Sequence, residues 1–195
     1  MFTAPEVVGR LAAVAPATPD DLDELTDLAW TRSLHPALAG WQATRVDDPG
    51  TAVVRPAHGG TVIGTISSRP LPGYPDVANV SIFTDTSTAR GGAALEAYAA
   101  VVSALFDQGA RLVHHEVLEL NRPIRRIFRG MRLEPSARYR QHGYVAGRLW
   151  DVLVYSFDQR FWEDVLDRIP NFSTPRANGP DLTDPARPEG PPDSA

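Results

Sequence analysis

The 195-residue sequence contains neither cysteine nor lysine. Without cysteine there is no disulfide, no thiolate zinc site and no cysteine nucleophile, so a metal would depend on histidine and carboxylate ligands. We expect no metal site. Because all 19 basic residues are arginine, a lysine Schiff base and the lysine-containing phosphate loop of nucleotide hydrolases are both excluded.

Long apolar runs are also missing. No stretch approaches the roughly 20 apolar residues that a membrane span requires, and Met1 to Ala17 lacks the basic region and apolar core of a secretion signal. We therefore expect a cytoplasmic protein without a membrane partner. The formal net charge of −5 argues against a general nucleic-acid binder, which would depend on neutralising phosphates, and we expect no nucleic-acid partner.

Composition divides the chain at about residue 170. Residues 1–169 have the length and apolar content of one ordinary domain. Residues 170–195 hold seven prolines in 26 positions, and Phe172 and Leu182 are their only sizeable apolar groups. Such a segment buries too little surface to offset its ordering entropy, so we expect a disordered tail over 170–195.

Hydrophobic periodicity and turn residues predict seven strands and four helices. The strands are expected at Val8–Val14, Thr51–Arg55, Thr61–Ser67, Val77–Phe83, Leu112–Leu120, Ala137–His142 and Leu149–Phe157, with residues 70–75 as a connector. Helices are expected after Thr18, from the glycine loop to about Gln108, over Asn121–Arg129, and after Asp158. This order predicts an α/β fold, in which helices flank a mixed central sheet of about seven strands.

The most informative segment joins the strand Val77–Phe83 to the alanine-rich helix. It is polar and ends in Gly91 and Gly92. A glycine turn that opens a helix presents unpaired backbone N–H groups and the positive end of the helix dipole to an anion. A double glycine alone is weak evidence, but its place between a strand and a helix favours a diphosphate site.

These residues resemble the acetyl-coenzyme A loop of the GNAT acyltransferases, which reads Gln or Arg, two residues, Gly, one residue, and Gly or Ala. Gly92 and Ala94 match the last two fixed positions, whereas Ala89 occupies the first and Arg90 follows it. Further similarities follow in the order of the family. They are Asn121 at a helix start, the segment Gly130–Glu134, and the strand Leu149–Phe157, which resembles the ribosomal-protein and aminoglycoside acetyltransferase branch.

The resemblance implies splayed central parallel strands and acetyl-coenzyme A as co-substrate. It implies direct attack by an amine, from a small molecule or a protein N-terminus, within a ternary complex. Two alternatives remain: a weak or inactive acyl-coenzyme A sensor, and an enzyme for a longer acyl group. Expected cofactor contacts are Ile82, Phe83, Thr84, Ala89, Arg90, Gly91, Gly92, Ala93, Ala94, Asn121 and Arg125.

Candidates for the general base gather on the strand before Asn121. They are His114, His115, Glu116 and Glu119, with Asp85 in the loop, and imidazole has a suitable ordinary pKa. Strand alternation places His115 and Glu119 on one face. Because Asn121 shares their parity, we predict His115 and Glu119 as the catalytic residues.

Two features of the following helix bear on the same chemistry. Many GNAT proteins carry a proton-donating tyrosine seven residues after the asparagine, but here that position is Phe128. Tyr139, Ser136 or water then remain as proton donors. Arginines at 122, 125, 126 and 129 form one helical stripe, which either contacts a coenzyme phosphate through Arg125 or is a solvated face. Whether the protein forms a homodimer stays open.

Overall fold

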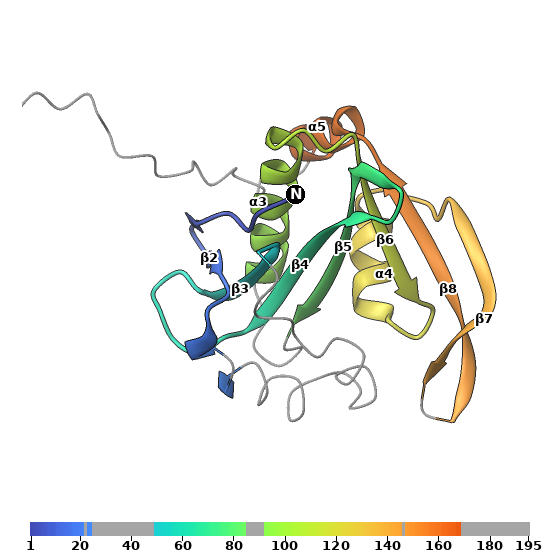
Figure 1. Cartoon of the computed structure of the whole chain (residues 1–195), viewed down its shortest axis with the longest axis horizontal. Helices are drawn as coiled ribbons and strands as arrows, with labels where there is room; N and C mark the ends of the chain where they lie inside the picture. The colour runs from blue at the N-terminus through green and yellow to red at the C-terminus, as the bar shows by residue number, and fades with distance from the viewer. Residues whose placement is uncertain (22, 25–48, 85–91, 146, 169–195) are drawn as a thin grey trace, which may run out of the picture.

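The computed structural model describes residues 1–21, 23–24, 49–84, 92–145 and 147–168 (Figure 1). An eight-stranded sheet lies at its centre in the order β1-β2-β3-β4-β5-β6-β8-β7. The strands are β1 (Val7–Val8), β2 (Ala12–Pro16), β3 (Thr51–Pro56), β4 (Gly64–Leu71), β5 (Tyr74–Thr84), β6 (Leu112–Leu118), β7 (Ala137–Val145) and β8 (Arg148–Phe157). The helical elements are η1 (Pro19–Asp21), α3 (Ala93–Asp107), α4 (Arg122–Gly130) and α5 (Gln159–Arg168).

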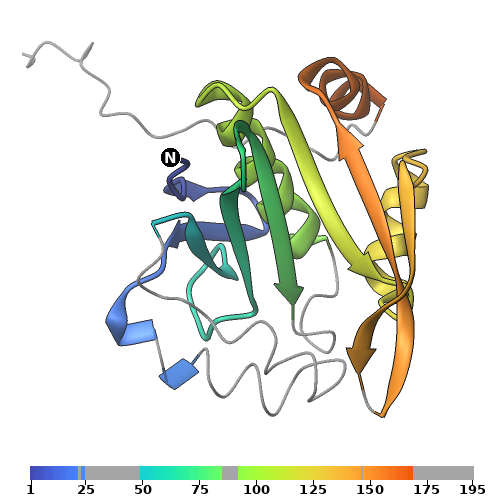
Figure 2. The same ribbon diagram turned by 45° about the vertical axis from the view of Figure 1, so that its right-hand side comes forward.

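The sheet is mixed, as expected. Strands β5 and β6 are parallel, and every other neighbouring pair is antiparallel. Helix α3 connects the two parallel strands, which need such a crossover. Side chains from α3, α4 and α5 join those of the sheet in one main core, so these three helices cover one face, which we call the helix face (Figure 2).

The other side of the sheet, which we call the opposite face, carries two smaller apolar clusters. One contains Val53 and Val62 with Phe83 packed against them. The second contains Leu118, Val145 and Val152, with Trp150 against them. The two clusters lie on either side of the boundary between β5 and β6, because Phe83 belongs to β5 and Leu118 to β6.

The N-terminal strand expected at Val8–Val14 is instead two short strands, β1 and β2, joined by a turn. The cause is a buried carboxylate on α3. Glu96 accepts hydrogen bonds from the backbone N–H groups of Arg10, Leu11 and Ala12, at 3.1, 2.7 and 2.8 Å. The turn therefore satisfies its amides through a side chain distant in sequence, which tightly fixes the N-terminal strands against the start of α3.

Residues 70–75 were expected to be a connector, but most of them belong to strands. β4 runs to Leu71 and β5 begins at Tyr74, so only a tight turn with Gly73 at φ 81° separates them. The ladder shifts register between Pro70 and Leu71, which lets a proline occur in the strand. Beyond η1, most of the helix expected after Thr18 lies outside the described residues, as does the tail expected at 170–195.

Gly50 is a position where the fold tolerates no side chain. A Cβ atom there would lie 1.9 Å from the backbone oxygen of Ser68, which cannot move without breaking the β3 and β4 pairing. We expect Gly50→Ala to lower the free energy of unfolding by at least about 2 kcal/mol. Urea unfolding measures this, with Gly130→Ala as control, because nothing lies within 4 Å of a Cβ at Gly130. Equal stability of the two variants would contradict the prediction.

No helix in the described part of the chain is both long and apolar enough to cross a membrane.

Candidate active site

The central parallel strands separate partway along their length. Their ladder joins Val77 to Leu112, Ala78 to Val113 and Asn79 to His114, and stops there. Both strands continue, since β5 runs to Thr84 beside β4 and β6 runs to Leu118 beside β8. Figure 2 shows the ends of β5 and β6 diverging. Past Asn79, the backbone groups of β5 that point toward β6 therefore lack the strand partner that a ladder would supply.

Helix α3 begins close to the end of β5. Its N-cap residue, Gly92, has φ 94° and provides no side-chain hydrogen bond to the helix. A left-handed conformation of this kind favours glycine. Since Gly92 has no side-chain acceptor, it does not cap the first amides of α3, and amides at a helix start suit an anion.

The described cofactor candidates fall into two groups. Ile82, Phe83 and Thr84 form the end of β5 beyond the last ladder pair, and Gly92, Ala93 and Ala94 form the start of α3. Because the divergent strand end and the helix start occupy the same end of the sheet (Figure 1), one extended ligand is able to reach both. The predicted contacts Ala89, Arg90 and Gly91, and the base candidate Asp85, lie outside the described residues.

His115, predicted as a base, lies in the core on the helix face. Its residue exposure is 2%, and Tyr98 Oη on α3 lies 2.9 Å from its Nε2 atom. The imidazole ring also contacts Phe128, at 5.0 Å between ring centroids, and stacks near Phe157 at 6.2 Å. A catalytic role for His115 stays a prediction, but a buried ring enclosed by aromatic side chains is placed for packing rather than for contact with an amine.

Burial lowers the pKa of His115 from its ordinary value of 6.5 to about 3, while a hydrogen bond with the backbone of Val80 acts in the opposite direction. A bond that favours the protonated ring is one in which the ring donates to the carbonyl. The neutral imidazole therefore donates to Val80 and accepts from Tyr98 at Nε2, which satisfies both nitrogens.

Glu119, the other predicted base, lies after the end of β6. Its carboxylate lies 3.4 Å from the guanidinium of Arg138, which also pairs with Asp151. The Glu119 backbone carbonyl accepts a hydrogen bond from Arg125 at 2.8 Å. Glu119 thus belongs to a charged cluster that connects β6, α4 and β7, and its catalytic role likewise stays a prediction.

The opposite face of β6 carries a different set of polar groups. Because Val113, His115 and Val117 point into the main core, alternation directs His114 and Glu116 to the opposite face. His114 Nδ1 lies 3.1 Å from Ser156 Oγ, and its Nε2 lies 3.9 Å from Glu116 Oε1. The Glu116 side chain is 39% exposed, so it is accessible beside the point where β5 and β6 separate.

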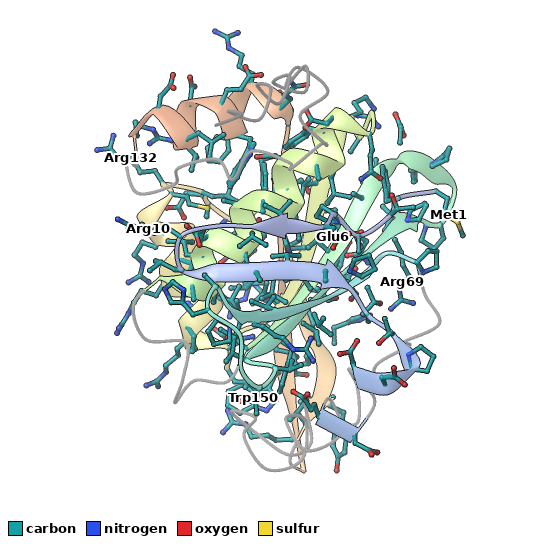
Figure 3. The ribbon with its side chains drawn as sticks, turned by 90° about the vertical axis from the view of Figure 1, so that its left-hand side faces the viewer. Met1, Glu6, Arg10, Arg69, Arg132 and Trp150 are labelled. Atoms are coloured by element: carbon teal, nitrogen blue, oxygen red, sulfur yellow. The ribbon has the colours of Figure 1, made fainter. Side chains whose placement is uncertain are left out.

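Apolar and aromatic side chains continue this surface toward the β7–β8 turn. Leu118, Val152 and Trp150 belong to the second cluster of the opposite face, and Arg148 lies over the Trp150 ring at 3.7 Å. Tyr139 pairs with Val152 across the strands and is 45% exposed. Figure 3 places Trp150 at the lower end of the molecule, the end at which β5 terminates in Figure 1. Glu116 and Tyr139 were both candidates from the sequence, but nothing in the sequence placed them on one surface.

Comparison with known proteins assigns this architecture. Residues 16–131 match the model of the acetyltransferase (GNAT) family. The chain belongs to the GNAT acetyltransferase family. Among curated protein sequences, none matches the chain significantly.

Solved structures share the GNAT fold at low sequence identity. A GCN5-related N-acetyltransferase from Brucella melitensis is 23% identical, covers 86% of each chain and has a TM-score of 0.66. An N-acetyltransferase from Staphylococcus aureus Mu50 is 19% identical over 75% of this chain and 98% of its own, with a TM-score of 0.58. A ribosomal-protein-alanine N-acetyltransferase from Brucella melitensis is 20% identical, with coverages of 74% and 98% and a TM-score of 0.57.

GNAT proteins transfer acetyl groups from acetyl-coenzyme A to amines, and the described backbone fits this co-substrate. Beyond Asn79 the edge of β5 is not paired with β6, and Gly92 provides no side-chain cap for α3. Such an edge suits an extended arm, and the amides at a helix start suit a phosphate. No cluster of three or more potential metal ligands occurs in the described ranges.

Two GNAT positions have structural partners, one at the N-cap of α4 and one within the helix. The Asn121 side chain accepts a hydrogen bond from the backbone N–H of Ile124 at 3.4 Å, so it caps the helix. Phe128, where many family members carry tyrosine, is 0% exposed and packs against Tyr155 with ring centroids 4.6 Å apart. A phenyl ring satisfies this apolar environment without a hydrogen-bond partner.

The buried imidazole makes stability depend on pH. Because the folded-state pKa of His115 lies below its ordinary value, the unfolded chain binds a proton that the folded chain excludes. We expect the free energy of unfolding to fall between about pH 6.5 and pH 3, with a contribution of up to about 1.4 kcal/mol per pH unit. Urea unfolding across this range, compared with His115→Gln, isolates the contribution. Identical slopes for both proteins would contradict it.

Proposed function

We propose that this protein is an N-acetyltransferase that transfers the acetyl group of acetyl-coenzyme A to a primary amine by direct attack in a ternary complex. The observation that carries the proposal is the divergence of β5 and β6 beyond the pair Asn79 and His114. It supports an extended pantetheine arm between the strands, with the diphosphate at Gly92, Ala93 and Ala94. The predicted contacts Ala89, Arg90 and Gly91 complete the phosphate loop in this proposal.

Glu116 is the proposed general base. It is the accessible carboxylate on the opposite face beside the separated strands, and His114 and Ser156 extend from it as a polar chain. In the proposed reaction the amine nitrogen attacks the thioester carbonyl carbon and the C–S bond breaks. Glu116 accepts a proton from the amine, and backbone N–H groups of β5 stabilise the negative charge that develops on the carbonyl oxygen.

Tyr139 is the proposed donor to the departing thiolate. Glu116 pairs with Val154 of β8, and Tyr139 pairs with Val152 of the same strand, so both side chains lie on the opposite face. Phe128 has no ionisable group and lies in the core. Ser136 already donates to the Val154 carbonyl at 3.2 Å, which makes it less suitable than the exposed phenol.

The acceptor is proposed to be a small-molecule amine or the N-terminal amine of a polypeptide. One structural relative is a ribosomal-protein-alanine N-acetyltransferase, which supports including peptide N-termini. The test incubates the protein with acetyl-coenzyme A and a panel of peptides, aminoglycosides and small amines, and follows thiol release and acceptor mass. Acetylated product supports the proposal, whereas absence of both signals with every acceptor contradicts it.

A second candidate function is an acyl-coenzyme A-binding module with weak or no catalysis. Phe128 at the usual tyrosine position favours it, because that side chain donates no proton. Tight binding of acetyl-coenzyme A without thiol release from any acceptor would support this second function. Transfer of a longer acyl group from its own thioester would instead identify an acyltransferase of different donor specificity.

A further inference from the structure

Two buried polar side chains meet where the central strands begin to separate. Tyr98 on α3 and His115 on β6 are 1% and 2% exposed, and Tyr98 Oη lies 2.9 Å from His115 Nε2. Buried polar groups are costly unless they are hydrogen-bonded. The proposed chemistry uses neither group, so their place in the core needs another explanation.

The position of His115 supplies that explanation. The last ladder pair joins Asn79 to His114, and His115 and Val80 are the next residue on each strand. There the imidazole hydrogen-bonds with the Val80 backbone. A side chain thus connects β6 to β5 at the first position where the backbone ladder no longer does. Through Tyr98, the same ring is also joined to α3.

We infer that His115, oriented by Tyr98, is a positioning residue that fixes the spacing of β5 and β6 at Val80, where their ladder has stopped, and so shapes the gap for the pantetheine arm. The inference rests on the proposed function for its ligand, whereas the separation of the strands is a property of the fold itself. His115 is the spacer between the two strands, Tyr98 fixes its tautomer, and Val80 is the residue of β5 that it contacts.

Aromatic packing makes the His115 spacer rigid. Phe128 of α4 contacts both rings, with centroids 5.0 Å from His115 and 6.5 Å from Tyr98. Phe157 of β8 lies on another side of the imidazole, with ring planes only 18° apart. Because these neighbours belong to different elements, rotation of the imidazole requires several of them to move together. This packing also gives Phe128 a role in which tyrosine is unnecessary.

Different substitutions separate the hydrogen bonds from the packing. His115→Leu removes both bonds and leaves the Tyr98 hydroxyl and the Val80 carbonyl without this partner. His115→Gln keeps one acceptor and one donor on a side chain of similar reach. Tyr98→Phe removes only the hydroxyl. Tyr155→Phe is the matched control, because Tyr155 is also buried on the helix face and packs on Phe128.

Calorimetric titration with two ligands tests the role of His115 as a spacer. Acetyl-coenzyme A contains the pantetheine arm, whereas 3′-phosphoadenosine 5′-diphosphate carries only the phosphate half. We expect His115→Leu to weaken acetyl-coenzyme A about tenfold, equivalent to about 1.4 kcal/mol, and the phosphate half less than about twofold. His115→Gln should retain most of the affinity for acetyl-coenzyme A, and Tyr155→Phe should match the natural protein. The affinity of Tyr98→Phe should lie between those of His115→Leu and His115→Gln. Equal losses for both ligands, or none for either, would overturn the inference.

Amide hydrogen exchange without ligand keeps this inference separate from the proposed function. In His115→Leu we expect faster exchange in the segments Val80–Thr84 and His115–Leu118 than in the natural protein, with β2 and β3 unchanged. Unchanged exchange in both segments would also overturn it. If the natural protein binds neither ligand, the proposed function fails, and exchange still decides the role of His115. Should His115→Leu not fold, Tyr98→Phe compared with Tyr155→Phe carries the same test.

Discussion

Glu116→Gln is expected to lower kcat for amine acetylation by about 10²- to 10³-fold while the Kd for acetyl-coenzyme A stays unchanged. The glutamine has nearly the same shape but cannot accept the proton of the attacking amine. Glu116 lies on the opposite face, 3.9 Å from His114, and is not among the residues proposed to contact the coenzyme. Steady-state kinetics with an acceptor found in the screen, together with calorimetry, separates these two quantities.

Glu119→Gln tests the rival assignment made from sequence. The Glu119 carboxylate faces Arg138 in a charged cluster, so we expect a much smaller fall in kcat there than for Glu116→Gln. Glu163→Gln, a change on α5 where the carboxylate pairs with Gln159, is the control for loss of a surface charge. A larger loss of kcat for Glu119→Gln than for Glu116→Gln would contradict our assignment and support Glu119 as the general base.

Gly92→Glu is expected to weaken acetyl-coenzyme A binding by at least about 100-fold. The substitution places a negative charge where the first amides of α3 are proposed to hold the diphosphate, and repulsion opposes a second anion there. It also introduces a side chain at φ 94°, a conformation that favours glycine. Isothermal titration measures the change in Kd.

Gly109→Glu is the matched control at the other end of the same helix. Its φ of 89° makes the backbone penalty similar, and nothing lies within 4 Å of a Cβ there. Because Gly109 follows the C-terminus of α3, the added charge is far from the proposed diphosphate, and we expect nearly unchanged affinity. Comparable losses in both variants would show that damage to the helix, rather than anion repulsion, causes the effect.

Much of this architecture was predictable from local sequence. Alternating apolar and polar residues predicted most strands. Asn121 and Asp158 were correctly placed at helix starts, since their side chains accept hydrogen bonds from the backbone N–H groups of Ile124 and Phe161. The succession of β5 and α3 was also predicted, whereas the loop expected between them lies outside the described residues. Such features depend on residues close together in the chain. The split between β1 and β2 was missed because Glu96, which causes it, is 84 to 86 positions away from its partners.

The surface of the candidate active site was harder to predict. Alternation correctly grouped His115 with Val113 and Val117, but it does not say which face the helices cover. The parity of Asn121 was used to choose, yet β6 ends at Leu118 and Asn121 caps a helix, so strand parity does not extend to it. Only tertiary packing shows that His115 is enclosed while Glu116 is accessible.

The central claim is that the backbone beyond Asn79 on β5, together with the start of α3, binds acetyl-coenzyme A. Amide hydrogen exchange with and without saturating acetyl-coenzyme A tests it most directly. We predict slower exchange in Val80–Thr84 and Gly92–Ala94 on binding, with no change in β1 or β2. Protection confined to other segments, or no protection anywhere at millimolar ligand, would contradict the account.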